Sequence, residues 1–257
     1  MPFAKLMSYC KFSQTSQLHK HYHDKEYGFP VADDNVLLER LALEINQAGL
    51  SWDLMLKKRE AFNKAFKNFE VDKVARFGAR DSARLMNDVG IVRNRLKIAA
   101  VIHNTKVIKD IQREFGSFAA WITFHSNERL EAKEWVKVFK KQGFKFVGGE
   151  IMKEFLQSIG HLPSPHDKDC PVNKEIFKAK VLAVVKAIPK GETMTYGEVA
   201  KLSGNPAAAR VVGALMRQNK DKRIPCHRVV ASKGLGGYNG LRGNSKATIL
   251  KKEGVII

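Results

Sequence analysis

The chain has 257 residues, enough for one large domain or two modest ones, and its 45 lysines and arginines outnumber 26 acidic residues, giving a net charge of +19. No stretch approaches the ~18 consecutive apolar residues of a membrane span, which excludes an integral helical membrane protein. Residues 1–12 lack the apolar core of a signal peptide. We therefore expect a protein of the cytoplasm, where thiols stay reduced, and three scattered cysteines are too few for a disulfide framework.

The positive charge is concentrated in the last third of the chain. Residues 173–257 contain 17 basic and 5 acidic side chains. A surplus of this size suggests a polyanionic partner, with nucleic acid favoured over a membrane surface. A lysine-rich soluble surface would produce the same composition, so charge alone leaves both interpretations open.

From Asp34 to about Gly160 the apolar residues recur at a spacing of three and four, which predicts an all-α domain. Asp33 and Ser51 have the side chains of helix N-caps and precede two of the apolar runs. The predicted helices span residues 34–48, 52–66, 93–115, 118–124, 127–141 and 148–159.

A turn containing Gly90, followed by the cationic Arg93, lies before the third of these helices. Such a turn can present backbone N–H groups and a helix N-terminus to a DNA phosphate. Most glycines at such places are ordinary turns, so the pattern needs its context.

Four separated motifs supply that context. They are YHDKEYG at 22–28, LEINQAGLSW at 43–52, KREAF at 58–62 and GFKFVG at 143–148. Together they closely resemble 3-methyladenine DNA glycosylase I, over about Ser8 to Cys170. The resemblance implies a helix-hairpin-helix around Gly90 that contacts DNA, with Arg93, and hydrolysis of the N-glycosidic bond of 3-methyladenine.

The same resemblance implies a structural zinc site. Cys10 and His23 near the start, with His166 and Cys170 near the end, match the zinc-binding pattern of that family. Two thiolates and two imidazoles suit tetrahedral Zn²⁺, and four protein ligands leave no open position for catalysis. The His166–Cys170 pair alone would more often be incidental.

The resemblance also implies a pocket for a flipped purine. Trp52 would supply a π surface, and Glu44 and Tyr22 would face the hydrogen-bonding edge of the base. Phe12 and Tyr27 stand where the family commonly has tryptophan, and both keep an aromatic ring. Glu44 would recognise and polarise the cationic base. Without the family match, a core tryptophan beside a solvated glutamate would be the simpler interpretation.

Cys226 is the candidate nucleophile of the C-terminal part. Thiolate is the reactive form of cysteine, and the adjacent His227 and Arg228 are residue types that lower a thiol pKa. A lone cysteine is more often a small buried hydrophobe. Here the run IPCHRVV at 224–230, followed by GGY at 236–238 and Glu253-Gly254, resembles the active-site signature of O6-alkylguanine-DNA alkyltransferases.

The secondary structure expected around this signature is a small α/β winged helix-turn-helix. A first helix is predicted over 174–188. Thr195 begins a capping box that opens a short helix, and Asn205 caps another that has Pro206 at its first position. A strand over 227–231 and a glycine-rich hairpin follow.

The resemblance assigns roles to the remaining candidate residues of this part. The alkyl group of guanine O6 would pass irreversibly to Cys226, so each molecule would act once. The other implied roles are Arg210 filling the space left by the flipped base, Tyr196 rotating the nucleotide, Tyr238 closing the guanine pocket, and Asn219, His227 and Glu253 supporting the thiolate. Arg228 is expected to contact DNA.

We therefore predict two domains, 1–172 and 173–257, that together form a bifunctional DNA-alkylation repair enzyme. The expected partner is alkylated double-stranded DNA, bound by a monomer that holds one zinc ion and associates with the nucleoid. The alternative is a glycosylase fused to a lesion-binding sensor that binds alkylguanine without transferring the alkyl group.

Overall fold

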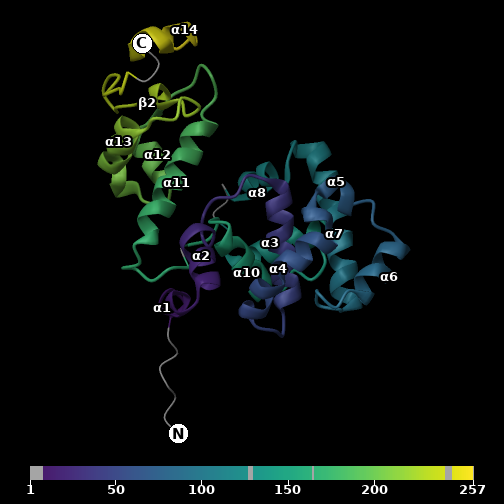
Figure 1. Ribbon diagram of the computed structural model, residues 1–257. Coiled ribbons are helices and arrows are strands. Elements are labelled where there is room, and N and C mark those ends of the chain that lie inside the picture. Colours follow the sequence, from purple (N-terminus) through teal and green to yellow (C-terminus); the bar gives the residue numbers. More distant parts are fainter. Residues whose placement is uncertain (1–7, 127–129, 164, 241–244, 257) are drawn as a thin grey trace. The chain divides into compact units, whose positions relative to one another are not determined.

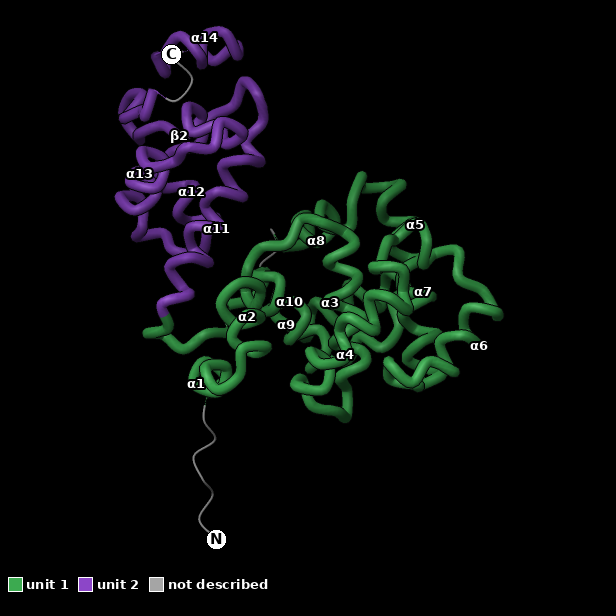
Figure 2. The backbone as a smooth tube through the Cα atoms, in the orientation of Figure 1, with its two compact units in different colours: residues 1–170 green, residues 171–257 purple. Residues whose placement is uncertain are grey.

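The structure is a computed structural model that describes residues 8–126, 130–163, 165–240 and 245–256. The chain divides into two compact units, residues 1–170 (unit 1) and residues 171–257 (unit 2), coloured separately in Figure 2. In the part of the chain described, no helix is long and apolar enough to cross a membrane.

The regular secondary structure in the described residues of unit 1 is helical, and both strands of the described chain lie in unit 2 (Figure 1). Its elements are α1 (Tyr9–Phe12), η1 (Ser13–Thr15), α2 (Gln17–Lys25), α3 (Asp34–Gln47), α4 (Trp52–Ala65), η2 (Lys67–Phe69), α5 (Val71–Val74), α6 (Ala79–Asn87), α7 (Arg95–Phe115), α8 (Phe118–Ser126), α9 (Ala132–Lys141) and α10 (Gly149–Ser158).

Helix α3 is the central element of unit 1. Ten consecutive residues, from Leu37 to Asn46, are buried, and the helix packs against α4, α7, α8 and α10. Burying one leucine or isoleucine side chain contributes roughly 1.5–3 kcal/mol to the free energy of folding. A helix that is buried all round therefore fixes the positions of the helices packed against it. The buried run includes Glu44.

The predicted caps of two helices are confirmed. Asp33 accepts hydrogen bonds from the amides of Asn35 at 2.8 Å and Val36 at 3.3 Å, and Ser51 accepts one from Leu54 at 3.2 Å. Side-chain oxygens at these positions satisfy amides that have no partner within the helix.

Two other helix starts differ from the prediction. Helix α7 begins at Arg95 because the Asn94 side chain caps it, accepting from the Leu96 and Lys97 amides at 3.0 and 3.1 Å. The helix predicted over 127–141 is α9, which begins at Ala132, and residues 127–129 lie outside the described residues.

Unit 2 contains α11 (Val172–Ala187), β1 (Met194–Thr195), α12 (Tyr196–Leu202), η3 (Pro206–Ala208), α13 (Ala209–Gln218), η4 (Cys226–Arg228), β2 (Val229–Val230) and α14 (Lys246–Lys252). The two strands pair in parallel, with Met194 opposite Val229 and Thr195 opposite Val230. A small core containing Val181, Val199 and Val212 joins α11, α12 and α13.

Parts of the predicted unit 2 need correction. The strand covers only Val229–Val230, because His227 lies in the 3-10 turn η4, where the Arg228 amide bonds the Pro225 carbonyl at 2.9 Å. Asn205 makes no side-chain cap, and the turn after it is 3-10 before α13 begins. The Thr195–Glu198 capping box is confirmed by amide contacts of 3.1 and 2.7 Å in the two directions.

Candidate functional sites

Four charged side chains lock α2, α3 and α4 together in unit 1. Arg59 contacts Glu39 through two N–H groups at 2.8 and 2.9 Å, and its third contact reaches Glu26 at 2.8 Å. Glu26 also accepts from the buried Arg40 at 2.5 Å. Charge-assisted pairs of this kind have strict geometry, so the network fixes the three helices that carry Tyr22, Glu44 and Trp52.

Those helices bring the predicted base-recognition residues together. Tyr22 lies with its ring centre 5.0 Å from Trp52 and is stacked on Tyr27 at 5.4 Å. The Arg40 guanidinium lies 4.9 Å from the Tyr22 ring centre. Tyr22 Oη and Trp52 Nε1 are buried and make no hydrogen bond of normal geometry with the described residues. Unsatisfied buried polar groups are costly, so a hydrogen bond from either group to a ligand would be favourable.

Glu44 belongs to this cluster electrostatically. Its side chain is 4% exposed, and burial, together with the charge of Glu154 and against the opposing charge of Arg40, raises its pKa to about 8. A neighbouring positive charge would restore the ionised form. The chemistry of Glu44 therefore suits a cationic ligand.

Phe12 occupies a different environment from the other predicted aromatic residues. It is 42% exposed, and its ring packs edge-on against the buried His19 at 5.0 Å. His19 in turn lies 3.2 Å from both Tyr9 Oη and the Asp53 carboxylate. No sequence motif marks His19.

Glu154 was also missed by sequence reasoning. It lies on α10, and its carboxylate accepts a hydrogen bond from Tyr27 Oη at 3.0 Å. The two residues are 127 positions apart. An acidic residue on a helix with charged neighbours is typical of a solvated face, so no local signal marked it.

Cys10, His23, His166 and Cys170 lie together as a cluster that can hold a metal ion. One ligand atom from each lies within 4.8 Å of all the others. Each thiol lies 3.7 Å from His166 Nδ1, and Cys170 lies equally far from His23 Nε2. The two thiols are half-buried.

The outer nitrogens of both histidines have hydrogen-bond acceptors. His23 Nδ1 lies 2.7 Å from the Asp24 carboxylate, and His166 Nε2 lies 2.7 Å from the Tyr27 carbonyl. With those nitrogens donating, the lone pairs of the inner nitrogens face each other across 3.0 Å. A cation between the two rings turns this repulsion into coordination.

The turn around Gly90 is held by hydrogen bonds within unit 1. The Gly90 amide donates to the Asp88 side chain at 2.8 Å, and Lys58 Nζ bonds the carbonyls of Val89 and Gly90 at 3.1 and 2.9 Å. A Cβ on Gly90 would lie 2.9 Å from Ala61 Cβ, so only glycine fits here. Arg93 is exposed beside the turn.

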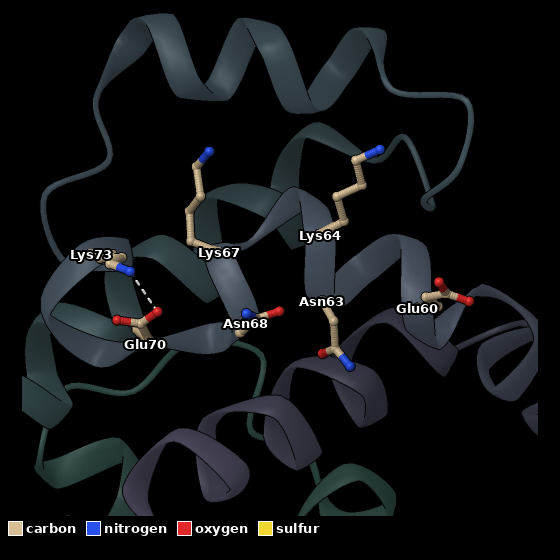
Figure 3. A pocket seen from close by; sticks show the side chains of 7 residues that line it. All are labelled: Glu60, Asn63, Lys64, Lys67, Asn68, Glu70 and Lys73. Atoms are coloured by element: carbon tan, nitrogen blue, oxygen red, sulfur yellow. Dashed lines mark hydrogen bonds and ion pairs between the residues drawn. The ribbon is translucent and has the colours of Figure 1, made fainter.

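A hollow in unit 1 has a different character from the aromatic cluster (Figure 3). Its lining is polar and solvated, and Lys73 pairs with Glu70 at 2.6 Å. It has no aromatic ring that could stack on a base. Its lining residues are Glu60, Asn63, Lys64, Lys67, Asn68, Glu70 and Lys73.

In unit 2, a cavity of about 400 Å³ opens onto Cys226. It also contains three of the predicted residues, Tyr196, Arg210 and Tyr238. Gly236 borders Tyr196 with φ +66°, and a Cβ there would lie 3.0 Å from the tyrosine ring. The other lining residues are Gly213, Ala214, Met216, Arg217, Gly237 and Asn239.

The Cys226 thiol has a defined hydrogen-bond partner. Cys226 is 5% exposed, and Asn219 Nδ2 donates to its sulfur at 3.2 Å and to the Asp221 carbonyl at 2.9 Å. Asn239 holds the turn by donating to the Met216 and Asn219 carbonyls at 2.9 and 3.0 Å. A hydrogen bond to sulfur favours the thiolate over the thiol.

Glu253 joins His227 and Arg228 behind the cysteine. His227 Nε2 lies 3.0 Å from Glu253, and Arg228 donates to both of its oxygens at 2.9 and 2.8 Å. The Arg228 hydrogen bonds outweigh the opposing effect of burial, and with His227 they lower the pKa of Glu253 to about 2. Arg228 also bonds the Ile188 carbonyl at 2.7 Å, so its guanidinium is engaged within the protein.

Lys246 is a further buried cation that the sequence analysis did not identify. It is 5% exposed, and its ammonium donates to the carbonyls of Val229 and Gly237. Burial lowers its pKa to about 8, and the charge of Cys226 acts in the opposite direction. Lys246 therefore lies close enough to the sulfur to stabilise a thiolate.

Two families of DNA-repair domains match the chain almost from end to end. The profile of the family described as methyladenine glycosylase matches residues 12–174. The profile described as 6-O-methylguanine DNA methyltransferase, DNA binding domain, matches residues 176–255. The chain therefore belongs to the methyladenine glycosylase family and carries a methyltransferase DNA-binding domain fused behind the glycosylase domain.

Individual proteins agree with this assignment. DNA-3-methyladenine glycosylase of Haemophilus influenzae is 33% identical over 178 residues, which cover 63% of this chain and 96% of that protein. The structure of 3-methyladenine DNA glycosylase I from Staphylococcus aureus is 34% identical, covers 63% of this chain and 95% of its own, and has a TM-score of 0.58.

The relatives of unit 2 are longer than the matched segment. Methylated-DNA–protein-cysteine methyltransferase of Methanosarcina acetivorans is 46% identical over 98 residues, covering 37% of this chain and 61% of that protein. Unit 2 thus corresponds to less than two thirds of this methyltransferase.

Proposed function

We propose that the chain repairs alkylated double-stranded DNA through two separate activities. Unit 1 hydrolyses the N-glycosidic bond of 3-methyladenine, and unit 2 transfers an alkyl group from guanine O6 to Cys226. The observation that carries this proposal is that each matched domain buries its candidate reactive residue in suitable surroundings, Glu44 within electrostatic reach of Tyr22 and Tyr27 and Cys226 at a cavity beside Asn219.

In unit 1, recognition depends on charge. Methylation at N3 makes the base cationic and a good leaving group, and Trp52 and Tyr22 offer it ring surfaces. The charge of Arg40 only partly offsets the burial of Glu44, and the cationic base then gives this carboxylate a further positive neighbour. The C1′–N9 bond breaks with its electron pair passing to the base, water adds to C1′ of the sugar, and the water proton is released.

In unit 2, the thiolate of Cys226 attacks the alkyl carbon. The new S–C bond forms as the carbon–O6 bond breaks, and the electron pair moves into the guanine ring, which takes up a proton. Asn219 and Lys246 are placed to stabilise the thiolate before attack. The thioether is stable, so the reaction is stoichiometric.

We further propose that the Cys10–His23–His166–Cys170 cluster binds one structural Zn²⁺. In tetrahedral zinc with Zn–S near 2.3 Å and Zn–N near 2.0–2.1 Å, sulfur and nitrogen ligands lie roughly 3.5 Å apart. The observed 3.7 Å separations support this ion. Zinc would join the two ends of unit 1, since His23 and His166 are 143 residues apart.

DNA would be engaged through flipping of the damaged nucleotide at each site. In unit 2, α12 and α13 would act as a winged helix-turn-helix, with Arg210 filling the stack and Tyr196 guiding the backbone. In unit 1, the Gly90 turn with the exposed Arg93 would contact phosphates. We expect a monomer associated with the nucleoid.

The second candidate function is that unit 2 senses O6-alkylguanine without reacting. The shortened match to the methyltransferases favours it, whereas the buried, hydrogen-bonded Cys226 favours transfer. The test is incubation of the full chain with duplexes that each carry one defined lesion, scored for released base and for alkylated Cys226 peptide by mass spectrometry. Lesion binding with an unmodified Cys226 peptide would establish the sensor.

A further inference from the structure

Glu154 differs from the acidic residues that surround it. On α10, Glu150 lies one turn earlier, is 85% exposed and faces Lys153 at 3.9 Å. The described residues provide no ion pair for Glu154, and its hydrogen bond comes from the neutral Tyr27 phenol at 3.0 Å. A carboxylate held without a cation has unbalanced negative charge.

That charge lies at the aromatic cluster. Tyr27, which holds Glu154, stacks on Tyr22, and Tyr22 contacts Trp52. Helix α10 packs directly against α3, the helix that carries Glu44. Glu154 is therefore the second carboxylate of the cluster, reached from another helix.

The two carboxylates interact. The charge of Glu154 contributes to the raised pKa of Glu44, which shows that they are close enough to repel. Arg40 opposes this effect, but its nearest carboxylate is Glu26, at 2.5 Å. The repulsion between two like charges beside a buried apolar surface is reduced most by a cation between them.

On the basis of the glycosylase activity proposed above, we infer that Glu154 is a second specificity-determining residue. Its carboxylate acts with Glu44 as an anionic pair that selects purines carrying a positive charge. Tyr27 is a positioning residue, because its phenol holds the Glu154 carboxylate at the cluster. A neutral base of the same shape would stack on the rings equally well but would not supply the positive charge that favours the ionised form of Glu44 beside Glu154.

The test compares a cationic lesion with its neutral isostere in the full chain. Release of 3-methyladenine is followed in single turnovers, and affinity is measured for a duplex carrying 3-deaza-3-methyladenine, which keeps the methyl group but not the charge. Glu154→Gln should slow release roughly tenfold, as expected for losing one close charge interaction. Its affinity for the neutral duplex should change less than about twofold, within the scale of a surface change.

Two further variants sharpen the result. Tyr27→Phe keeps the ring but frees Glu154, so it should reduce release in the same direction by a smaller factor, again without affecting the neutral duplex. Glu150→Gln is the matched control on the same helix and should behave as wild type. Circular dichroism melts of all variants report whether the fold is retained.

The outcomes separate the inference from the function on which it rests. A wild-type chain that releases no 3-methyladenine would overturn the proposed glycosylase activity itself. If wild type is active, equal release by Glu154→Gln and wild type overturns the role of Glu154. Equal losses for the cationic and neutral duplexes overturn it too, because they indicate a purely structural effect.

Discussion

Glu44 in unit 1 and Glu253 in unit 2 are both shielded glutamates beside a candidate reactive centre, yet their surroundings act in opposite directions. Burial without a hydrogen-bonded cation raises the pKa of Glu44 to about 8. Hydrogen bonds from Arg228 and the charge of His227 lower the pKa of Glu253 to about 2, although burial opposes them. The Glu44 carboxylate is left for a cationic ligand to neutralise, whereas the Glu253 carboxylate is already neutralised by partners within the protein.

The difference matches the chemistry proposed for each unit. A hydrolase that binds a cationic base gains selectivity when its carboxylate lacks a counter-ion until the base arrives. A suicide nucleophile needs a fixed histidine and a stable charge network before the substrate binds. The two sites also differ in how far apart their residues lie in the sequence. The Cys226 network lies between Asn219 and Glu253, whereas the unit 1 cluster contains residues from Tyr22 to Glu154.

The strongest test that the two activities are independent replaces each candidate reactive residue in turn. Cys226→Ala should abolish alkyl transfer completely, because no other thiol lines the described cavity, and should leave 3-methyladenine release unchanged. Glu44→Gln should lower release by about 10²-fold or more, within the range for losing a group that acts in the transition state, with transfer unaffected. Paired assays on the same preparations measure both. Loss of both activities in either variant would contradict the independence of the units.

Metal removal should affect the units unequally. Cys170→Ser should reduce bound zinc and destabilise unit 1 by several kcal/mol, since structural zinc contributes on the order of 10 kcal/mol to small metal-dependent folds. Unit 2 should keep its alkyl-transfer rate. Elemental analysis and hydrogen exchange, compared between the units, provide the measurement. Cys226→Ser is the control and should retain zinc, and a purified wild-type chain without zinc would exclude the proposed ion.

Much of the fold could be predicted from local sequence. The side chains at Asp33, Ser51 and Thr195 each satisfy helix amides two or three residues away, so their effect is visible in a short window. Asn205 carries the same chemistry but makes no cap, because a 3-10 turn precedes α13. A cap residue in the sequence indicates a side chain that can accept from helix amides, but the conformation of the neighbouring backbone determines whether the hydrogen bond forms.

The sites were predictable only where a motif marked them. Glu154 and Lys246 have no local signal, because their roles depend on contacts with Tyr27 across 127 residues and with Val229 across 17. Arg228 is the reverse case, since its sequence position suggested DNA but Glu253 and Ile188 take up its guanidinium. Tertiary partners, which the sequence does not display, decide the role of a charged residue.

The raised pKa of Glu44 gives unit 1 a specific dependence on pH. The folded carboxyl titrates at about 8 against an ordinary value of 4.5. Folding therefore takes up a proton between these values, and its contribution is complete below pH 4.5 and lost as pH rises through about 8. The free energy of unfolding of unit 1 should fall by on the order of 4 kcal/mol across this window.

Glu44→Gln should flatten that dependence, because glutamine cannot ionise. Denaturant unfolding at a series of pH values, read by hydrogen exchange within unit 1, measures the slope. Glu150→Gln is the exposed control and should keep the wild-type slope. Identical slopes for Glu44→Gln and wild type would mean that Glu44 is ionised in the folded chain at neutral pH.

Glu253 should produce the opposite slope in unit 2, and a smaller one. Its folded pKa of about 2 lies below the ordinary value of 4.5. The stabilisation is therefore present above pH 4.5 and disappears as pH falls through about 2. Because Glu253 remains 12% exposed, part of the effect is screened, and we expect about 2 kcal/mol at neutral pH.

Glu253→Gln should be less stable than wild type at pH 7, and the gap between their free energies of unfolding should close towards pH 2, where the wild-type carboxyl is also neutral. Glu175→Gln, which removes an exposed carboxylate of the same unit, should show no such convergence. A gap that stays constant down to pH 2 would mean that Glu253 stabilises unit 2 through packing, and the contrast with Glu44 would then lie in shape and not in charge.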